Sequence, residues 1–256
     1  MVLVDSHCHL DVGEFDADRA VVVERARACG VVLQVVPAIS AAGWPKLREV
    51  CASFDGLHAA YGLHPMYLDE HEDTHLEALA GWIERERPIA VGECGLDYFI
   101  DGLDRERQQH FFDGQLRLAG EHGLPVIVHA RRAVDAVIAS IRRHHGVRGV
   151  VHSFSGSPEQ ARQLWELGFL IGLGGPLTYE RASRLRKLVA GMPLEFLLLE
   201  TDAPDQPDAW RRGMRNEPAR LRCVLDTVAA LRGEASEAIA AATTANARRL
   251  FGLPLP

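Results

Sequence analysis

Lysine is scarce in this sequence, and so is net positive charge. Of the 256 residues only Lys46 and Lys187 are lysines, and 28 basic residues stand against 35 acidic ones, which gives a formal net charge of −7. This balance argues against a surface that grips long nucleic acid non-specifically through positive potential. It leaves room for a local phosphate site built from a few arginines.

Paired cysteines and long apolar runs are also missing. The five cysteines are widely spaced and contain no C-x-x-C pair, which argues against a disulfide framework or a structural zinc knuckle. The opening segment, MVLVDSHCHL, has neither the basic region nor the apolar stretch of a signal peptide, and no later run reaches membrane-spanning length. We therefore expect a cytoplasmic protein that does not engage a membrane.

Short apolar runs alternate with helical segments along the whole chain, which is typical of parallel strands covered by helices on both faces. Eight runs fit this pattern: Val2–Val4, Val31–Val36, His58–Tyr61, Ile89–Val91, Val126–Val128, Gly149–Val151, Phe169–Ile171 and Phe196–Leu199. The apolar fraction of 47% is enough for a large core. The sequence predicts an α/β fold of the TIM type, a (β/α)8 barrel that forms a single domain over residues 1–256.

Histidines and acids lie at the carboxyl ends of these runs, where barrel enzymes gather their catalytic groups. Six positions stand out as candidate metal ligands: His7 and His9 after the first run, Glu93 after the fourth, His129 at the end of the fifth, His152 after the sixth and Asp202 after the eighth. Since parallel strand ends meet at one mouth of a barrel, we expect these side chains to converge there.

Each residue of this set also has a plain structural interpretation. His7 and His9 are two apart and project to the same side of an extended chain, yet an isolated pair of this kind is also typical of hydrogen-bonded core histidines. Glu93 follows an apolar run, where a lone carboxylate would be costly to bury and a role as a bridge between two cations removes that cost. The prediction of a metal centre therefore depends on all six positions together.

The predicted cofactors are two divalent cations per chain. Imidazole with carboxylate suits Zn, Mn, Fe, Ni or Co and suits Mg less well. A carbamylated lysine bridge is disfavoured because Lys46 and Lys187 fall within predicted helices, away from strand ends. Asp202 is placed to bind metal and to accept the proton of the attacking water, so Asp202 and Glu93 are the predicted catalytic residues.

The sequence resembles the TatD family of metal-dependent deoxyribonucleases over essentially its whole length. The motifs that carry the resemblance are DSHCHLD, YGLHP, GECGLDY, PVIVHAR, HSFSG, ETDAP, RNEP and TTANARRLF. It implies a TIM barrel of the amidohydrolase superfamily with a binuclear site made of the six ligands. It further implies hydrolysis of DNA phosphodiesters, typically exonucleolytic, with His64 near the substrate phosphate.

The loop after Asp202 departs from the commoner family pattern and puts the substrate in doubt. It carries Arg211, Arg215 and Trp210, and arginine with an aromatic ring is a combination that binds single strands. Trp210 packed against its own barrel is the alternative. Together with His64 and Arg131, the two arginines are the predicted substrate contacts.

The predicted reaction is attack by a hydroxide shared between the two ions on DNA, either single-stranded or at its ends, with no obligate protein partner. The alternative is an amide, ester or lactone hydrolase, because a metal-activated hydroxide also attacks carbon and a fold does not fix function. A scaffold protein is the second rival, and its expected sign, a missing ligand, is absent from this sequence.

Overall fold

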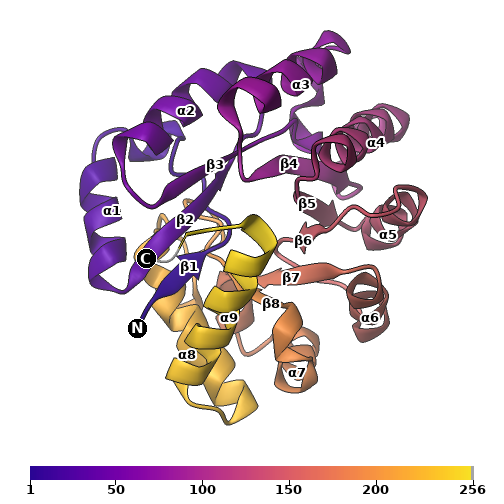
Figure 1. Cartoon of the computed structure of the whole chain (residues 1–256). Coiled ribbons are helices and arrows are strands. Elements are labelled where there is room, and N and C mark those ends of the chain that lie inside the picture. The colour runs from indigo at the N-terminus through magenta and orange to yellow at the C-terminus, as the bar shows by residue number, and fades with distance from the viewer. Residues whose placement is uncertain (255–256) are drawn as a thin grey trace.

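Eight parallel strands, ordered β1 to β8 around one sheet, form the centre of a computed structural model that describes residues 1–254 (Figure 1). The strands are β1 Leu3–Asp5, β2 Val31–Pro37, β3 Leu57–Tyr61, β4 Ala90–Asp97, β5 Val126–Arg131, β6 Gly149–Val151, β7 Phe169–Leu173 and β8 Leu197–Leu199. Main-chain hydrogen bonds also bring β8 next to β1. For example, the N–H of Ser6, just after β1, donates to the carbonyl of Leu199 in β8 at 3.0 Å. The predicted (β/α)8 barrel is confirmed.

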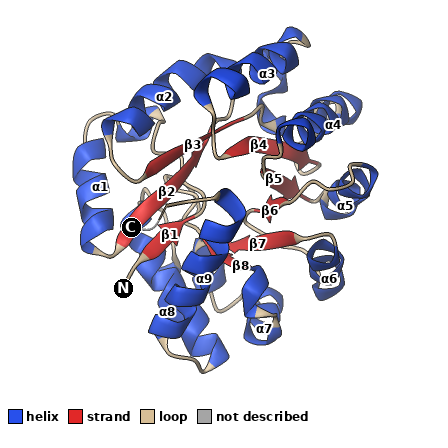
Figure 2. Ribbon diagram, in the orientation of Figure 1, coloured by secondary structure: helices blue, strands red, loops and turns tan. Residues whose placement is uncertain are grey.

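Helices cover the strands, most of them around the outside of the barrel (Figure 2). They are α1 Arg19–Ala28, α2 Trp44–Ser53, α3 Thr74–Glu86, α4 Arg105–His122, α5 Val134–Arg143, α6 Pro158–Glu166, α7 Ser183–Gly191, α8 Leu221–Arg232 and α9 Ser236–Phe251. Short 3-10 turns add η1 Gly13–Phe15, η2 Ala41–Gly43, η3 Pro65–Glu70, η4 Gly175–Thr178, η5 Leu194–Phe196, η6 Ala209–Arg211 and η7 Pro218–Arg220. No helix within residues 1–254 has the length and apolarity needed to cross a membrane.

Local sequence signals set where several helices begin and end. Asp104 caps α4 by accepting the backbone N–H groups of its first turn, and Gly123 ends the helix in a left-handed conformation. Ser157 and Gln160 form a capping box at the start of α6. These caps fix the loops that follow β4 and β6, which carry part of the site.

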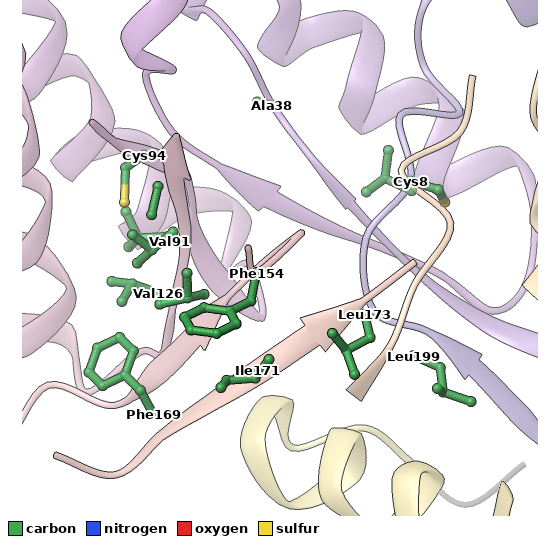
Figure 3. Packing of buried hydrophobic residues seen from close by; sticks show 14 of the residues in the cluster. Cys8, Ala38, Val91, Cys94, Val126, Phe154, Phe169, Ile171, Leu173 and Leu199 are labelled. Carbon is green, nitrogen blue, oxygen red and sulfur yellow. The ribbon is translucent and has the colours of Figure 1, made fainter. Parts of the chain in front are cut away.

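Two apolar layers hold the barrel together. The outer layer lies between strands and helices, and Figure 3 shows part of it, including Val126 and Phe169. The inner layer takes residues from all eight strands, among them Ile127, Val150 and Leu198, and is joined by the end of α9, which lies in front of β1 and β8 in Figure 1.

The inner layer sets the positions of the site residues, because side chains alternate across a strand. Two residues beyond Ile127 stands His129, two beyond Val150 stands His152, and two beyond Leu198 stands Glu200. The filled interior therefore gives way to polar side chains toward the carboxyl ends of the strands.

The predicted end of the fourth strand was wrong. The sequence prediction stopped it at Val91, whereas β4 continues to Asp97 because the pairing with β5 runs on to Asp97 and Arg131. Glu93 therefore lies within β4 rather than after it, and His129 lies within β5 rather than at its end.

Candidate metal centre

All six predicted ligands converge at the mouth of the barrel, and Glu93 stands at their centre. Glu93 is 1% exposed and its Oε2 lies 3.1 Å from His7 Nε2 and 3.5 Å from His9 Nε2. Asp202 Oδ1 lies 3.5 Å from each of the same two nitrogens. His7, His9 and Asp202 therefore form one ligand group on the Oε2 side of Glu93.

The other carboxylate oxygen of Glu93 faces a second group of imidazoles. Its Oε1 lies 2.8 Å from His152 Nε2, 3.1 Å from His129 Nδ1 and 3.0 Å from His64 Nε2. The two oxygens of one buried glutamate thus face different ligand sets, which is the arrangement a bridging carboxylate requires.

These nitrogen and oxygen atoms are better suited to bind divalent cations than to form hydrogen bonds with one another. A carboxylate oxygen has two lone pairs, yet three ring nitrogens lie within 3.1 Å of Glu93 Oε1. On the other side, the Nε2 atoms of His7 and His9 are 3.1 Å apart, a contact between two acceptors unless a proton or a cation lies there. Imidazole nitrogens with carboxylate oxygens are the ligands that Zn, Mn and related ions take in proteins.

For two of the rings, those of His9 and His129, a hydrogen bond on the far side decides which nitrogen can bind metal. His9 Nδ1 lies 3.1 Å from the carbonyl of Pro37, and His129 Nε2 lies 2.9 Å from Asp97 Oδ2. Each of these nitrogens donates, which leaves His9 Nε2 and His129 Nδ1 free as ligands.

In His64, by contrast, the nitrogen that faces Glu93 carries the proton. Its Nδ1 accepts the backbone N–H of Met66 at 3.1 Å, so a neutral ring carries its proton on Nε2 and donates it to Glu93. Burial lowers the pKa of His64, although Glu93 opposes the shift. His64 is therefore built as a hydrogen-bond donor at the site rather than as a ligand.

The surrounding histidines favour the ionised form of the two central carboxylates. Burial opposes the charge on Glu93, but His152, His64 and His7 together hold its pKa well below the usual range. Burial likewise raises the pKa of Asp202, but the hydrogen bond with His9 and the nearby histidines lower it to about 2. Divalent cations would neutralise the negative charge of these two carboxylates.

Three supporting polar residues were missed by sequence reasoning. Asp97 is fully buried and orients His129 as described above. It stands four residues after Glu93 on the same face of β4, a spacing that was available as a signal once the strand was known to continue.

Glu200 and Gln206 support the opposite side of the centre. Glu200 is fully buried, accepts the backbone N–H of Ser153 and lies 3.8 Å from His152 Nδ1, and burial raises its pKa to about 8. A Cβ on Gly172 would lie 2.1 Å from Glu200 Oε2, so a side chain at this position would displace the Glu200 carboxylate.

Gln206 donates its amide to Asp202 Oδ2 and accepts the hydroxyl of Ser153 at 2.7 Å. Ser153, Asp202 and Gln206 all have positive φ, between 45° and 57°. This conformation is uncommon outside glycine and is concentrated at functional sites.

A cavity of about 620 Å³ opens above the centre. Its lining includes His9, His64, Glu93, Asp202 and Arg131. This volume is in the range of sites that take small molecules or the end of a chain.

The remaining predicted substrate contacts lie outside the cavity lining. Arg215 forms a two-point ion pair with Asp18, at 2.6 and 2.9 Å, and Arg211 contacts Met214 Sδ at 3.6 Å. Trp210 is 68% exposed, so it is not packed against the barrel.

The barrel and its convergent histidines and carboxylates define a class of protein, the metal-dependent hydrolases. The family model for "TatD related DNase" matches residues 4–252. The chain belongs to the TatD family.

Related proteins match the chain along nearly its full length. The chain is similar to an "uncharacterized metal-dependent hydrolase", YjjV of Escherichia coli K12, at 42% identity over 254 residues, with 98% of each chain covered. It is 34% identical to the "3'-5' ssDNA/RNA exonuclease TatD" of Klebsiella pneumoniae, with 98% of each covered. The crystal structure of Escherichia coli YjjV superposes with a TM-score of 0.95 at 41% identity, with 98% of each chain covered.

Proposed function

We propose that this hydrolase is a deoxyribonuclease that removes nucleotides from single-stranded DNA or from DNA ends. The observation that carries the proposal is the division of ligands between the two oxygens of Glu93, which suits a pair of cations. When bound, two divalent cations polarise a phosphoryl oxygen and acidify the attacking water. The relative from Klebsiella pneumoniae, with its exonuclease name, favours a nucleic-acid substrate.

The side chains around the cations supply proton transfer and positioning. Asp202 is ionised and held by Gln206, so it is placed to take the proton of the attacking water. The Nε2–H of His64 donates a hydrogen bond to Glu93. It can instead donate to a phosphoryl oxygen of the substrate as negative charge develops on that oxygen.

Among the arginines, Arg131 is the best placed to contact the DNA backbone, because it lines the cavity. Arg211 and Arg215, on the loop after β8, are proposed to act farther along the strand, where Arg215 would exchange its ion pair with Asp18 for a phosphate. Neither needs to reach the cations for that role.

The test compares two substrate classes. End-labelled single-stranded DNA and a panel of esters, amides and lactones are incubated with Mg, Mn, Zn or no metal, using wild type, Glu93→Ala and the exposed Glu180→Ala as a matched control. We expect metal-dependent release of nucleotides that is lost only in Glu93→Ala. Turnover of a lactone or ester with none of DNA would instead support the small-molecule hydrolase.

A further inference from the structure

An exposed aromatic ring and an arginine lie against each other beside the metal centre. Phe99, just after β4, is 42% exposed, and the guanidinium carbon of Arg131, at the end of β5, lies 3.6 Å from its ring centroid. The two residues meet because Asp97 pairs with Arg131 and the N–H of Tyr98 donates to the Arg131 carbonyl at 2.8 Å. The separation is that of a guanidinium stacked on a ring.

The same carboxylate that orients His129 also fixes the segment that bears Phe99. Asp97 Oδ1 accepts the N–H groups of Phe99 and Ile100 at 2.9 and 3.2 Å, while its Oδ2 accepts from His129 Nε2. The ring is therefore held at a set position relative to a metal ligand rather than carried on a free loop.

Among the residues that the structure describes, Arg131 has no acidic partner. Within residues 1–254 no carboxylate lies within 4 Å of its guanidinium, whereas Arg215 is paired with Asp18. An unpaired guanidinium that lines the cavity of an acidic chain is available to an anionic ligand. Phe99 does not line the cavity, and its ring packs against the guanidinium without forming part of the cavity wall.

We propose that Arg131, backed by Phe99, is a subsite for one unpaired nucleotide of the strand, and the inference rests on the proposed nuclease function. The base stacks on the cavity-facing side of the guanidinium, and the positive charge lies near the adjoining phosphate. Bases stack in this way on arginine planes and aromatic rings, and only unpaired bases offer a free face. The subsite thus selects single-stranded over duplex substrate.

The test separates stacking from charge. KM is measured for an oligothymidylate and for an abasic oligomer of the same length, with wild type, Arg131→Lys, Phe99→Ala and Arg132→Lys. Lysine keeps the charge but has no plane on which a base can stack. Arg132 is the matched control, because it also lies near the ring, at 4.6 Å, but does not line the cavity.

We expect Arg131→Lys and Phe99→Ala to raise KM for the oligothymidylate about tenfold, in line with one lost base stack, and to leave KM for the abasic oligomer unchanged. Arg132→Lys should match wild type on both. Equal effects on both oligomers, or no effect of Arg131→Lys while wild type degrades DNA, would overturn the subsite and leave the nuclease standing. Failure of metal-loaded wild type to degrade either oligomer would overturn both.

Discussion

Replacement of Asp97 by asparagine tests whether the hydrogen bond behind His129 controls metal binding. Asp97 Oδ1 accepts two backbone N–H groups and its Oδ2 accepts from His129 Nε2 at 2.9 Å. In Asp97→Asn the side-chain oxygen must stay with the backbone donors, which turns the amide NH₂ toward His129. Two donors then face each other, and His129 is driven to the tautomer with its proton on Nδ1, the nitrogen that faces Glu93.

The size of the expected loss of metal affinity follows from the role of residues that hydrogen-bond to a metal-binding histidine. Residues that orient a metal-binding histidine are typically worth 10–100-fold in metal affinity, about 1.4–2.7 kcal/mol. Calorimetric titration of metal-depleted protein with Mn²⁺ or Zn²⁺ should give weaker binding of that size in Asp97→Asn. Asp101→Asn, an exposed carboxylate a few residues along the same segment, should titrate like wild type. A well-folded Asp97→Asn with wild-type affinity would refute the assigned tautomer.

Three further predictions concern other parts of the molecule. Gln206→Leu should lower kcat on DNA about ten- to a hundredfold with little change in KM, since a hydrogen bond to a charged group such as Asp202 contributes about 1.5–3 kcal/mol; a change in KM alone would contradict this role. Phe169→Ala removes a fully buried ring of the outer core and should cost about 3–5 kcal/mol of unfolding free energy in urea titrations, and a cost below 1 kcal/mol would argue against the packing. The hydrogen bond from Arg215 lowers the pKa of Asp18, so the pair stabilises the fold above the usual aspartate pKa and the effect is lost as pH falls through the lowered pKa. Thermal melts should show a larger difference between Arg215→Ala and wild type at pH 7 than at pH 3, and an equal difference at both would contradict the ion pair.

The convergence of the six candidate ligands was predictable from sequence because it depends on strand ends. Each apolar run marks a strand, and parallel strands bring their carboxyl ends to one mouth, so His152 and Asp202 were placed without knowledge of side-chain contacts. The same logic misplaced the end of β4, since the polar and glycine residues of GECGLD are atypical of a strand and the pairing with β5 overrides them.

The supporting residues were not predictable in this way. Asp97 binds His129 only because β4 and β5 continue past the apolar part of their runs. Gln206 reaches Asp202 through a loop whose left-handed conformation no spacing rule specifies. Pairing of Arg215 with Asp18 joins residues 197 positions apart, a contact that a single sequence does not reveal.

The measurement that tests the central claim most directly is the number of cations bound per chain. Wild type and Glu93→Gln are saturated with Zn²⁺ or Mn²⁺, passed through a desalting column and analysed by mass spectrometry for metal and protein. We expect two cations per chain in wild type and fewer than two in Glu93→Gln, because the amide no longer supplies two anionic oxygens to the two ligand groups. No bound cation in wild type, or two retained in Glu93→Gln, would contradict the bridge on which the proposed chemistry depends.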